Sequence, residues 1–184
     1  MTLETSAARD RLLRTAHALF YRDGIRATGI DRVIAEAAVT KVTFYRHFPS
    51  KDVLVRAFLD YRHDLWMGWF VDALGRHGGA SRGLSALADA MQEWFTQPGF
   101  RGCAFINAVA ETGGDPADTR AAAAAHKREM GEVIRALLPA DDTSADRTAA
   151  MAALAVDGAI VQAQIGAPDN AAADLRALLA ALEN

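Results

Sequence analysis

The sequence has little of what a disulfide framework, a membrane span or a β-sheet requires. Cys103 is the single cysteine among 184 residues, so the chain forms no disulfide within itself. No apolar run approaches the roughly 20 residues that cross a bilayer, and the polar N-terminal segment does not have the pattern of a secretion signal. Valine and isoleucine are sparse, and alternating apolar and polar residues are absent, which disfavours strands. We therefore expect a cytoplasmic, all-α protein that does not enter a membrane.

The charge of the chain is divided unevenly along its length. The formal net charge of −3 disfavours proteins that coat nucleic acid through a broad positive surface. Residues 1–60 nevertheless carry ten Lys and Arg against seven Asp and Glu, a net +3, while residues 61–184 carry ten against sixteen, a net −6. A mildly basic head on an acidic body is expected where the head alone meets phosphate, although such an excess is ordinary for a segment of this length.

Apolar residues recur at helical spacing throughout the chain, and Gly and Pro mark the breaks. In the first segment Leu12, Ala16 and Leu19 share one face, and Gly24 suits the C-terminal cap that follows. The pattern predicts about nine helices, over residues 6–22, 30–37, 40–48, 50–74, 81–96, 101–111, 117–138, 144–165 and 170–183.

The second and third predicted helices have the pattern of a helix-turn-helix. Both are short, about three residues separate them, and Thr28 or Gly29 is the expected cap of the second helix. Such a pair needs apolar faces that fix its angle, and the candidates are Ile30, Val33, Ile34, Val39, Phe44 and Phe48. It also needs short donors and small apolar groups that reach base edges, and the candidates are Thr40, Lys41, Val42, Thr43, Arg46 and His47.

The segment GIRATGIDRVIAEAAVTKVTFYRHFPSKDVL, residues 24–54, resembles the DNA-binding domain of the TetR family of bacterial repressors. The matching features are Gly24, Thr28, Ala37-Ala38-Val39, Tyr45-Arg46-His47-Phe48 and Lys51. About 50 residues match strongly, and the rest is similar in architecture. The resemblance implies an N-terminal three-helix helix-turn-helix DNA-binding domain over residues 1–50. It also implies a C-terminal helical bundle for ligand binding and dimerisation over residues 51–184.

The resemblance further implies which residues contact double-stranded operator DNA. Thr28, Tyr45 and Lys51 are implied to bind phosphates, and Lys51 also stands at a helix N-terminus, where backbone N–H groups attract phosphate. The residues implied to face the major groove are Lys41, Val42, Thr43 and His47, with Thr40 at the start of the same helix. The alternative for each residue taken singly is an ordinary solvated position.

The turn departs from the family pattern at Ala38, where Gly is usual. A positive φ at this position strains a residue that carries a Cβ. We expect the turn to accommodate Ala38 with a slight rearrangement, rather than through a changed crossing angle of the two helices.

The family resemblance implies a cavity for a small-molecule inducer in the C-terminal bundle. The candidate ligand-binding residues are Trp66, Trp69, Phe70, Met91, Trp94, Phe95, Phe105 and Asn107. Their aromatic character favours an apolar or aromatic effector, and the alternative is ordinary core packing. Asn107 and Glu111 share a helix face, as pocket groups or as a structural pair. Cys103 has a redox-sensing and an inert interpretation, and the second is favoured.

The last two predicted helices are the candidates for a homodimer interface. Small residues line one side of the first of them, at Ala149, Ala152, Ala153, Gly158, Ala159 and Ala163. Leucines at Leu175, Leu178, Leu179 and Leu182 stripe the second. Two such helices from each protomer fit a four-helix interface, and the alternative is burial within one chain.

Together these patterns favour a sequence-specific transcriptional regulator, a repressor that an inducer releases from a pseudo-palindromic operator. The sequence contains no nucleophile triad order, phosphate loop, dinucleotide fingerprint or metal-ligand set. We therefore expect no enzyme, no metal and no cofactor. A nonspecific architectural protein is the other alternative, and the acidic net charge disfavours it.

Overall fold

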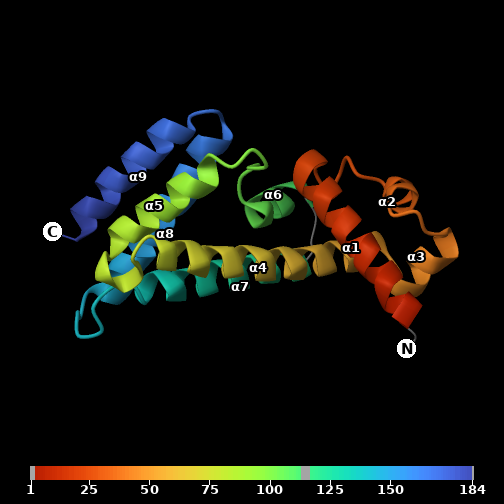
Figure 1. Ribbon diagram of the computed structural model, residues 1–184, viewed down its shortest axis with the longest axis horizontal. Helices are drawn as coiled ribbons and strands as arrows, with labels where there is room; N and C mark the ends of the chain where they lie inside the picture. Colours follow the sequence, from red (N-terminus) through yellow and green to blue (C-terminus); the bar gives the residue numbers. More distant parts are fainter. Residues whose placement is uncertain (1–2, 113–116, 184) are drawn as a thin grey trace. The chain divides into compact units, whose positions relative to one another are not determined.

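The computed structural model describes residues 3–112 and 117–183, and these residues form nine α-helices and one short 3-10 helix without a strand (Figure 1). The all-α prediction is confirmed, and the helix ends lie within about three residues of those expected. The elements are α1 (Leu3–Asp23), α2 (Ile30–Glu36), α3 (Lys41–His47), α4 (Lys51–Arg76), η1 (Gly79–Ser81), α5 (Leu84–Phe95), α6 (Ala104–Glu111), α7 (Ala117–Arg135), α8 (Ala145–Gln164) and α9 (Pro168–Leu182). None of the helices in the described ranges combines the length and apolar character that crossing a bilayer requires.

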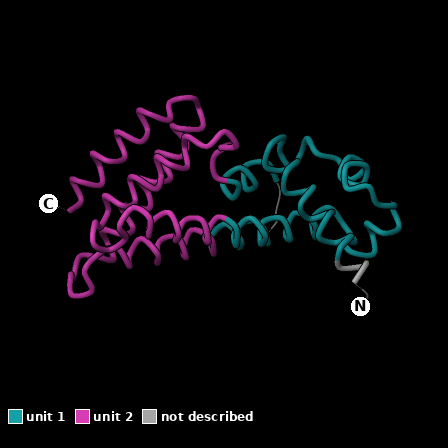
Figure 2. Tube along the Cα trace, viewed as in Figure 1, with its two compact units in different colours: residues 1–65, 104–124 teal, residues 66–103, 125–184 magenta. Residues whose placement is uncertain are grey.

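The chain folds into two compact units, which Figure 2 distinguishes by colour. Unit 1 comprises residues 1–65 and 104–124, and unit 2 comprises residues 66–103 and 125–184. α4 and α7 contribute residues to both units, and α6 belongs to unit 1 with the first three helices. The functional boundary expected at residue 50 stays a prediction.

The core of unit 1 forms where α2 and α3 pack against α1 and against each other. The expected stripe of α1 is buried at Leu12, Ala16 and Leu19. Phe20 of α1 meets Phe58 of α4 edge to face, with the ring centroids 5.4 Å apart. This packing fixes the place of the short helices, which are too short to be stable alone.

The N-terminus of α4 is capped as the sequence indicates. The backbone N–H of Val53 donates to Oγ of Ser50 at 3.2 Å, and Asp52 stands in the first turn. Of the two expected N-cap residues of α2, Gly29 is confirmed and Thr28 is not the cap. Glycine has no side chain that could accept a capping hydrogen bond, and the Thr28 hydroxyl donates to the Gly24 carbonyl instead.

In unit 2, α5 packs against α9 and α8, and α8 packs along α9. The small residues of α8 serve this packing, since Ala149, Ala152 and Ala159 are buried within the chain. Of the α9 leucines, Leu175 and Leu179 are buried in the same way. The structure therefore supports intrachain burial for this side of the two helices, which sequence reasoning had favoured as the interface between protomers.

A different face of α8 is apolar and exposed. Its members, with the C-cap residue Ile165, are spaced three, seven and four residues apart, so they form one stripe along the helix: Met151, Leu154, Val161 and Ile165. Leu154 and Ile165 are each 72% exposed, and Leu178 of α9 is also exposed. A contiguous apolar stripe of this kind marks an interaction surface more often than an isolated exposed leucine does.

Candidate nucleic-acid interface

α3 presents an exposed, mixed polar and apolar surface on a buried aromatic base. Thr40 is its N-cap residue, and the Thr40 hydroxyl accepts a hydrogen bond from the backbone N–H of Thr43 at 3.1 Å. The inward side is held by Phe44, which is fully buried. The outward side includes Val42, 71% exposed, and Tyr45, 43% exposed. A valine exposed to this extent gains little from folding, so its side chain is available for contact with a partner.

The polar groups of α3 already have weak local partners. The hydroxyls of Thr40 and Thr43 lie 2.9 Å apart, and the Lys41 ammonium lies 3.4 Å from the Asp31 carboxylate. Both groups of that ion pair are exposed, so water and salt screen it and it contributes little. Lys41 can therefore leave Asp31 for a phosphate or a base edge at low cost.

The turn between α2 and α3 is a Schellman motif with alanine at the position where glycine is usual. The N–H of Val39 donates to the Ile34 carbonyl at 3.3 Å, and the N–H of Ala38 donates to the Ala35 carbonyl at 3.1 Å. Ala38 has a φ of 51°, in the left-handed region, and no other non-glycine residue of the described segments has a positive φ. Ala38 thus takes the left-handed conformation that the departure from glycine implied, and the choice between a slight rearrangement and a changed crossing angle stays a prediction.

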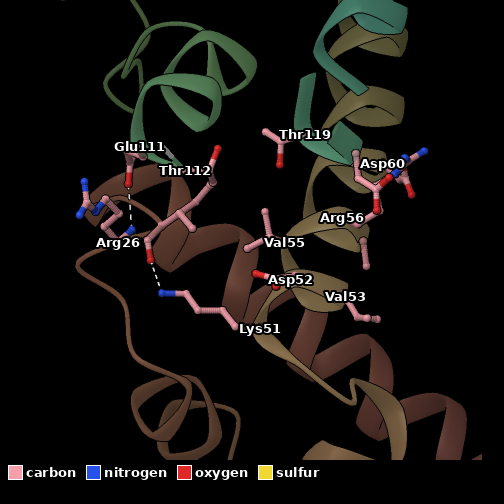
Figure 3. Close-up of a pocket in the computed structure, with 13 residues that line it drawn as sticks. Arg26, Lys51, Asp52, Val53, Val55, Arg56, Asp60, Glu111, Thr112 and Thr119 are labelled. Atoms are coloured by element: carbon pink, nitrogen blue, oxygen red, sulfur yellow. Dashed lines mark hydrogen bonds and ion pairs between the residues drawn. The ribbon is translucent and has the colours of Figure 1, made fainter. Parts of the chain in front are cut away.

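Three side chains fasten the backbone of the linker between α1 and α2. The Thr28 hydroxyl donates to the Gly24 carbonyl at 2.8 Å, and the Lys51 ammonium donates to the Ile25 carbonyl at 2.6 Å. The backbone N–H of Arg26 donates to the Glu111 carboxylate at 2.9 Å (Figure 3). Since the three side chains come from the linker, α4 and α6, the linker conformation depends on all three elements.

Glu111 is a residue whose contact the sequence did not indicate. The sequence placed it on one face of α6 with Asn107. Its carboxylate instead accepts a hydrogen bond in the linker between α1 and α2, 85 residues away in sequence. The fit is close, because a Cβ added at Gly24 would lie 2.9 Å from the Glu111 carboxylate oxygen. Gly24 also has a φ of +93°, so both the backbone and the neighbouring carboxylate favour glycine here.

The implied phosphate-binding residues differ in how accessible they are. Tyr45 is exposed, whereas Thr28 is fully buried with its hydroxyl bound to Gly24. The pKa of Lys51 lies below its ordinary value, because the effect of burial outweighs that of the nearby Glu111 and Asp52 carboxylates, which raise it. The phosphate contacts stay predictions, and for Thr28 the contact would have to come from the backbone.

His47, implied to face the major groove, is half-buried at the end of α3. Its Nε2 atom is inaccessible and has no hydrogen-bond partner in the structure. Any base contact by His47 therefore falls to the remainder of the ring, and it too stays a prediction.

Figure 3 shows a cleft in unit 1 beside this linker, with a volume of about 910 Å³. Cationic and anionic side chains share its walls: Arg26, Lys51, Arg56, Asp52, Asp60, Glu111 and Asp118. Apolar contributions come from Ile25, Val53, Val55 and Ala57. None of the residues expected to bind an effector lines this cleft.

The expected effector-binding residues divide between the two units. Unit 2 contains Trp66, Trp69, Phe70, Met91, Trp94 and Phe95, whereas Phe105 and Asn107 belong to unit 1. All of these side chains are buried except Trp69 and Asn107, which are half-buried. In unit 2 the rings form one cluster, in which the Trp66 centroid lies 4.7 Å from Phe70 and 5.4 Å from Trp94. Their role in ligand binding stays a prediction.

Cys103 is buried just before α6. Among residues 3–112 and 117–183, no group of three His, Cys, Asp or Glu side chains is placed to hold a metal ion.

Comparison with known proteins gives a local match over the helix-turn-helix segment and structural matches along most of the chain. Residues 12–58 match the family model described as bacterial regulatory proteins, tetR family. A TetR-family transcriptional regulator from Streptomyces coelicolor is 33% identical, with a TM-score of 0.84 over 96% of this chain and 94% of that one. A TetR transcriptional regulator from Chloroflexus aurantiacus is 26% identical, with a TM-score of 0.80 over 97% of each chain.

Among curated proteins the similarity is local. An uncharacterized HTH-type transcriptional regulator of Bacillus subtilis, YerO, is 34% identical over 53 residues, which are 29% of this chain and 18% of that protein. The match thus spans about a fifth of the relative's length. A cysteine mutant of the regulator CifR, solved with 26-bp double-strand operator DNA, is 23% identical with a TM-score of 0.76, over 94% of this chain and 95% of that one.

The local match lies over α1 to α4, and the structural match extends through all nine helices of the described residues. The architecture expected from the resemblance is confirmed in both parts. This chain belongs to the TetR family of bacterial regulatory proteins.

Proposed function

We propose that the chain is a sequence-specific DNA-binding transcriptional regulator, a repressor that leaves its operator when a small molecule binds. The observation that carries the proposal is the surface of α3, where Val42 and Tyr45 are exposed on a helix whose Phe44 is fully buried. This helix lies within the segment that matches the family model. The operator complex of CifR, a protein of the same fold, supports DNA as the partner.

Base readout is assigned to the exposed side of α3. Val42 suits the methyl group of thymine, and the Lys41 ammonium suits the acceptors of guanine in the major groove. Thr40, Thr43 and His47 stand beside them, the two hydroxyls paired with each other and the His47 ring half-buried. We therefore expect Lys41 and Val42 to carry more of the sequence preference than His47.

Phosphate binding is assigned to Tyr45, Lys51 and the backbone at Thr28. The Lys51 ammonium has three N–H donors, and the Ile25 carbonyl accepts one of them. Lys51 can thus bind a phosphate while it still fastens the linker. The Thr28 hydroxyl has no such spare donor, because it has a single O–H that donates to Gly24.

A homodimer is required because one short reading helix buries too little surface for tight specific binding. We assign the interface to the exposed stripe formed by Met151, Leu154 and Val161 of α8 and Ile165 at its C-cap, together with Leu178 of α9. A two-fold axis brings the same stripe of two protomers together, and the operator is then pseudo-palindromic. Leu154→Glu with Ile165→Glu should yield monomers in sedimentation, while Val71→Glu, also on an exposed apolar residue, should stay dimeric.

Effector binding is assigned to the aromatic cluster of unit 2. α4 carries Trp66, Trp69 and Phe70 of this cluster and, in unit 1, Lys51, which donates to the Ile25 carbonyl in the linker between α1 and α2. A ligand that moves α4 changes the spacing of two readers on half-sites about one helical turn apart, where little error is tolerated. Structures with and without ligand that have equal reader separations would refute this coupling.

The family and the fold are those of regulators rather than enzymes. We place the protein in the cytoplasm, since that is where a bacterial operator lies. Residues 1–50 are proposed as the DNA-binding domain and residues 51–184 as the effector and dimerisation domain, with Glu111 of α6 in contact with the first.

The test is selection of random duplexes by the purified protein, followed by a salt titration on the enriched sequence. We expect a pseudo-palindrome, with an affinity that falls by about 10³–10⁵ between about 50 and 200 mM salt if the dimer makes about 6–10 phosphate contacts. Lys41→Ala with Tyr45→Ala should abolish the enrichment. Arg128→Ala, an equal charge change at an exposed position of α7, is the matched control and should leave it intact.

Absence of enrichment with a folded, ligand-free sample would overturn the proposal. Mass spectrometry of the purified protein checks the last condition, because a bound effector would hold the reader in its released state. If Arg128→Ala loses as much affinity as Lys41→Ala with Tyr45→Ala, the interaction is a nonspecific charge attraction and not base readout.

A further inference from the structure

The indole nitrogen of Trp66 is an unpaired hydrogen-bond donor inside unit 2. Trp66 is 5% exposed, and its Nε1 atom is inaccessible and has no hydrogen-bond partner in the structure. An indole N–H donates and cannot accept, so it cannot be satisfied by changing its role. Buried tryptophan N–H groups usually find an acceptor, and one without an acceptor requires an explanation.

The surroundings of Trp66 are aromatic rings. Phe70 stacks on it with the ring planes 20° apart, and Trp94 and His126 meet it edge to face with centroids 5.4 and 5.1 Å away. These contacts explain why the ring is buried but do not give its N–H an acceptor. An apolar cluster that contains an unpaired donor has the composition of a ligand site, in which a few polar groups fix the orientation of a flat molecule.

Trp69 is the ring of this cluster that a ligand can displace most easily. Trp69 is half-buried, whereas Trp66, Phe70 and Trp94 are buried. Its ring is tilted by 50° against Trp66 and by 43° against Trp94, with centroids more than 6 Å away, so it makes no close stack. A planar molecule that takes the place of this ring reaches the centre of the cluster.

We propose that the effector is a planar aromatic molecule with a neutral hydrogen-bond acceptor, which replaces the Trp69 ring and accepts the Trp66 Nε1–H. This inference rests on the proposed function, of which it specifies the ligand class. The tryptophan and phenylalanine rings of the site bear no charge, and His126, which meets Trp66 edge to face, is neutral unless protonated. A ring nitrogen or carbonyl suits neutral rings better than a carboxylate, because these rings do not offset the desolvation of a charge.

Quinoline and naphthalene form a matched pair of probes, since they have nearly the same shape and differ in one acceptor nitrogen. Equilibrium dialysis, below the aqueous solubility of naphthalene, measures their affinities for the full-length protein. We expect quinoline to bind the wild type about tenfold more tightly. Trp66→Phe keeps a stacking ring but removes the N–H, so it should abolish the preference. Tyr61→Phe removes an O–H donor from a half-buried ring of α4 that lies in unit 1, outside the cluster, and should keep the preference.

A second measurement requires no variant. In the wild type labelled with ¹⁵N-tryptophan, quinoline should move the Trp66 indole proton resonance downfield, and naphthalene should not. Equal affinities of the two probes, failure of both to bind, or a preference that survives in Trp66→Phe would each overturn the proposal. Operator selection reports on the proposed function separately. A wild type that binds quinoline selectively but enriches no duplex supports the subsite and refutes the DNA reader.

Discussion

Replacing Ala38 by glycine tests the backbone strain in the turn between α2 and α3. Ala38 occupies the C′ position of a Schellman motif with a φ of 51°, and the N–H groups of Ala38 and Val39 close the two hydrogen bonds of the motif. Glycine adopts this conformation without a steric penalty, so Ala38→Gly should keep both hydrogen bonds and relieve the backbone. We therefore expect an increase in the free energy of unfolding.

The size of the increase follows from two opposing effects. A left-handed conformation costs a non-glycine residue about 1–2 kcal/mol. Glycine also makes the unfolded chain more flexible, which opposes folding by about 0.5–1 kcal/mol. The Ala38 side chain is exposed, so its removal forfeits little packing. The difference predicts a net stabilisation of about 0.5–1 kcal/mol.

Urea denaturation followed by circular dichroism, at one fixed protein concentration, measures this difference. The matched control is Ala35→Gly, at an exposed position within α2 three residues earlier. There the same substitution should destabilise by about 0.5–1 kcal/mol, because glycine is a poor helix former. The dependence on urea should be the same in all three proteins. If Ala38→Gly destabilises the protein as much as Ala35→Gly does, the turn is unstrained and the reasoning is wrong.

Three further changes test contacts that lie within unit 1 or within unit 2. Glu111→Ala should speed hydrogen exchange of the Arg26 amide at least about tenfold, while Glu111→Gln should not; equal protection in both variants would contradict the bond. Burial, with a smaller effect of Arg62, lowers the pKa of His17 to about 4, whereas the unfolded ring titrates near 6.5. Stability therefore falls as the pH drops from about 6.5 toward 4, and His17→Phe should remove on the order of 2 kcal/mol of the loss measured by urea denaturation between about pH 7 and pH 4.5; an unchanged pH dependence would refute this. The carboxylate of Glu183 accepts the N–H of Leu84 at the start of α5, so Glu183→Ala should lower the free energy of unfolding by about 1 kcal/mol and Glu183→Gln by less.

Much of the fold and of the reader could be predicted from the sequence because the responsible interactions are local. Helical spacing and the Gly and Pro breaks gave the helices, and Gly24 and Ser50 were identified as caps from their own residue types and positions. The buried Phe44 and the exposed Val42 follow from one helical period. A positive φ at Ala38 follows from the resemblance, because the family pattern usually has glycine at this position of the turn.

The remaining features depend on residues far apart in sequence. The local pattern allowed either Thr28 or Gly29 to cap α2. Gly29 is the cap, and the Thr28 hydroxyl donates to the Gly24 carbonyl instead. Helical periodicity shows which side of α8 is apolar but not what covers each side, so the small residues and the Leu154 stripe could not be ranked as interfaces.

What the sequence by itself determined is the helices, the exposed and buried sides of α3, and the resemblance to the family, because each depends on neighbours within a few turns. What only the tertiary structure decided is the contact of Glu111 with the Arg26 amide, 85 residues away, and the burial of the Trp66 indole N–H without an acceptor. Hydrogen-bond partners and burial depend on which surfaces meet in space, and periodicity along one helix does not contain that information.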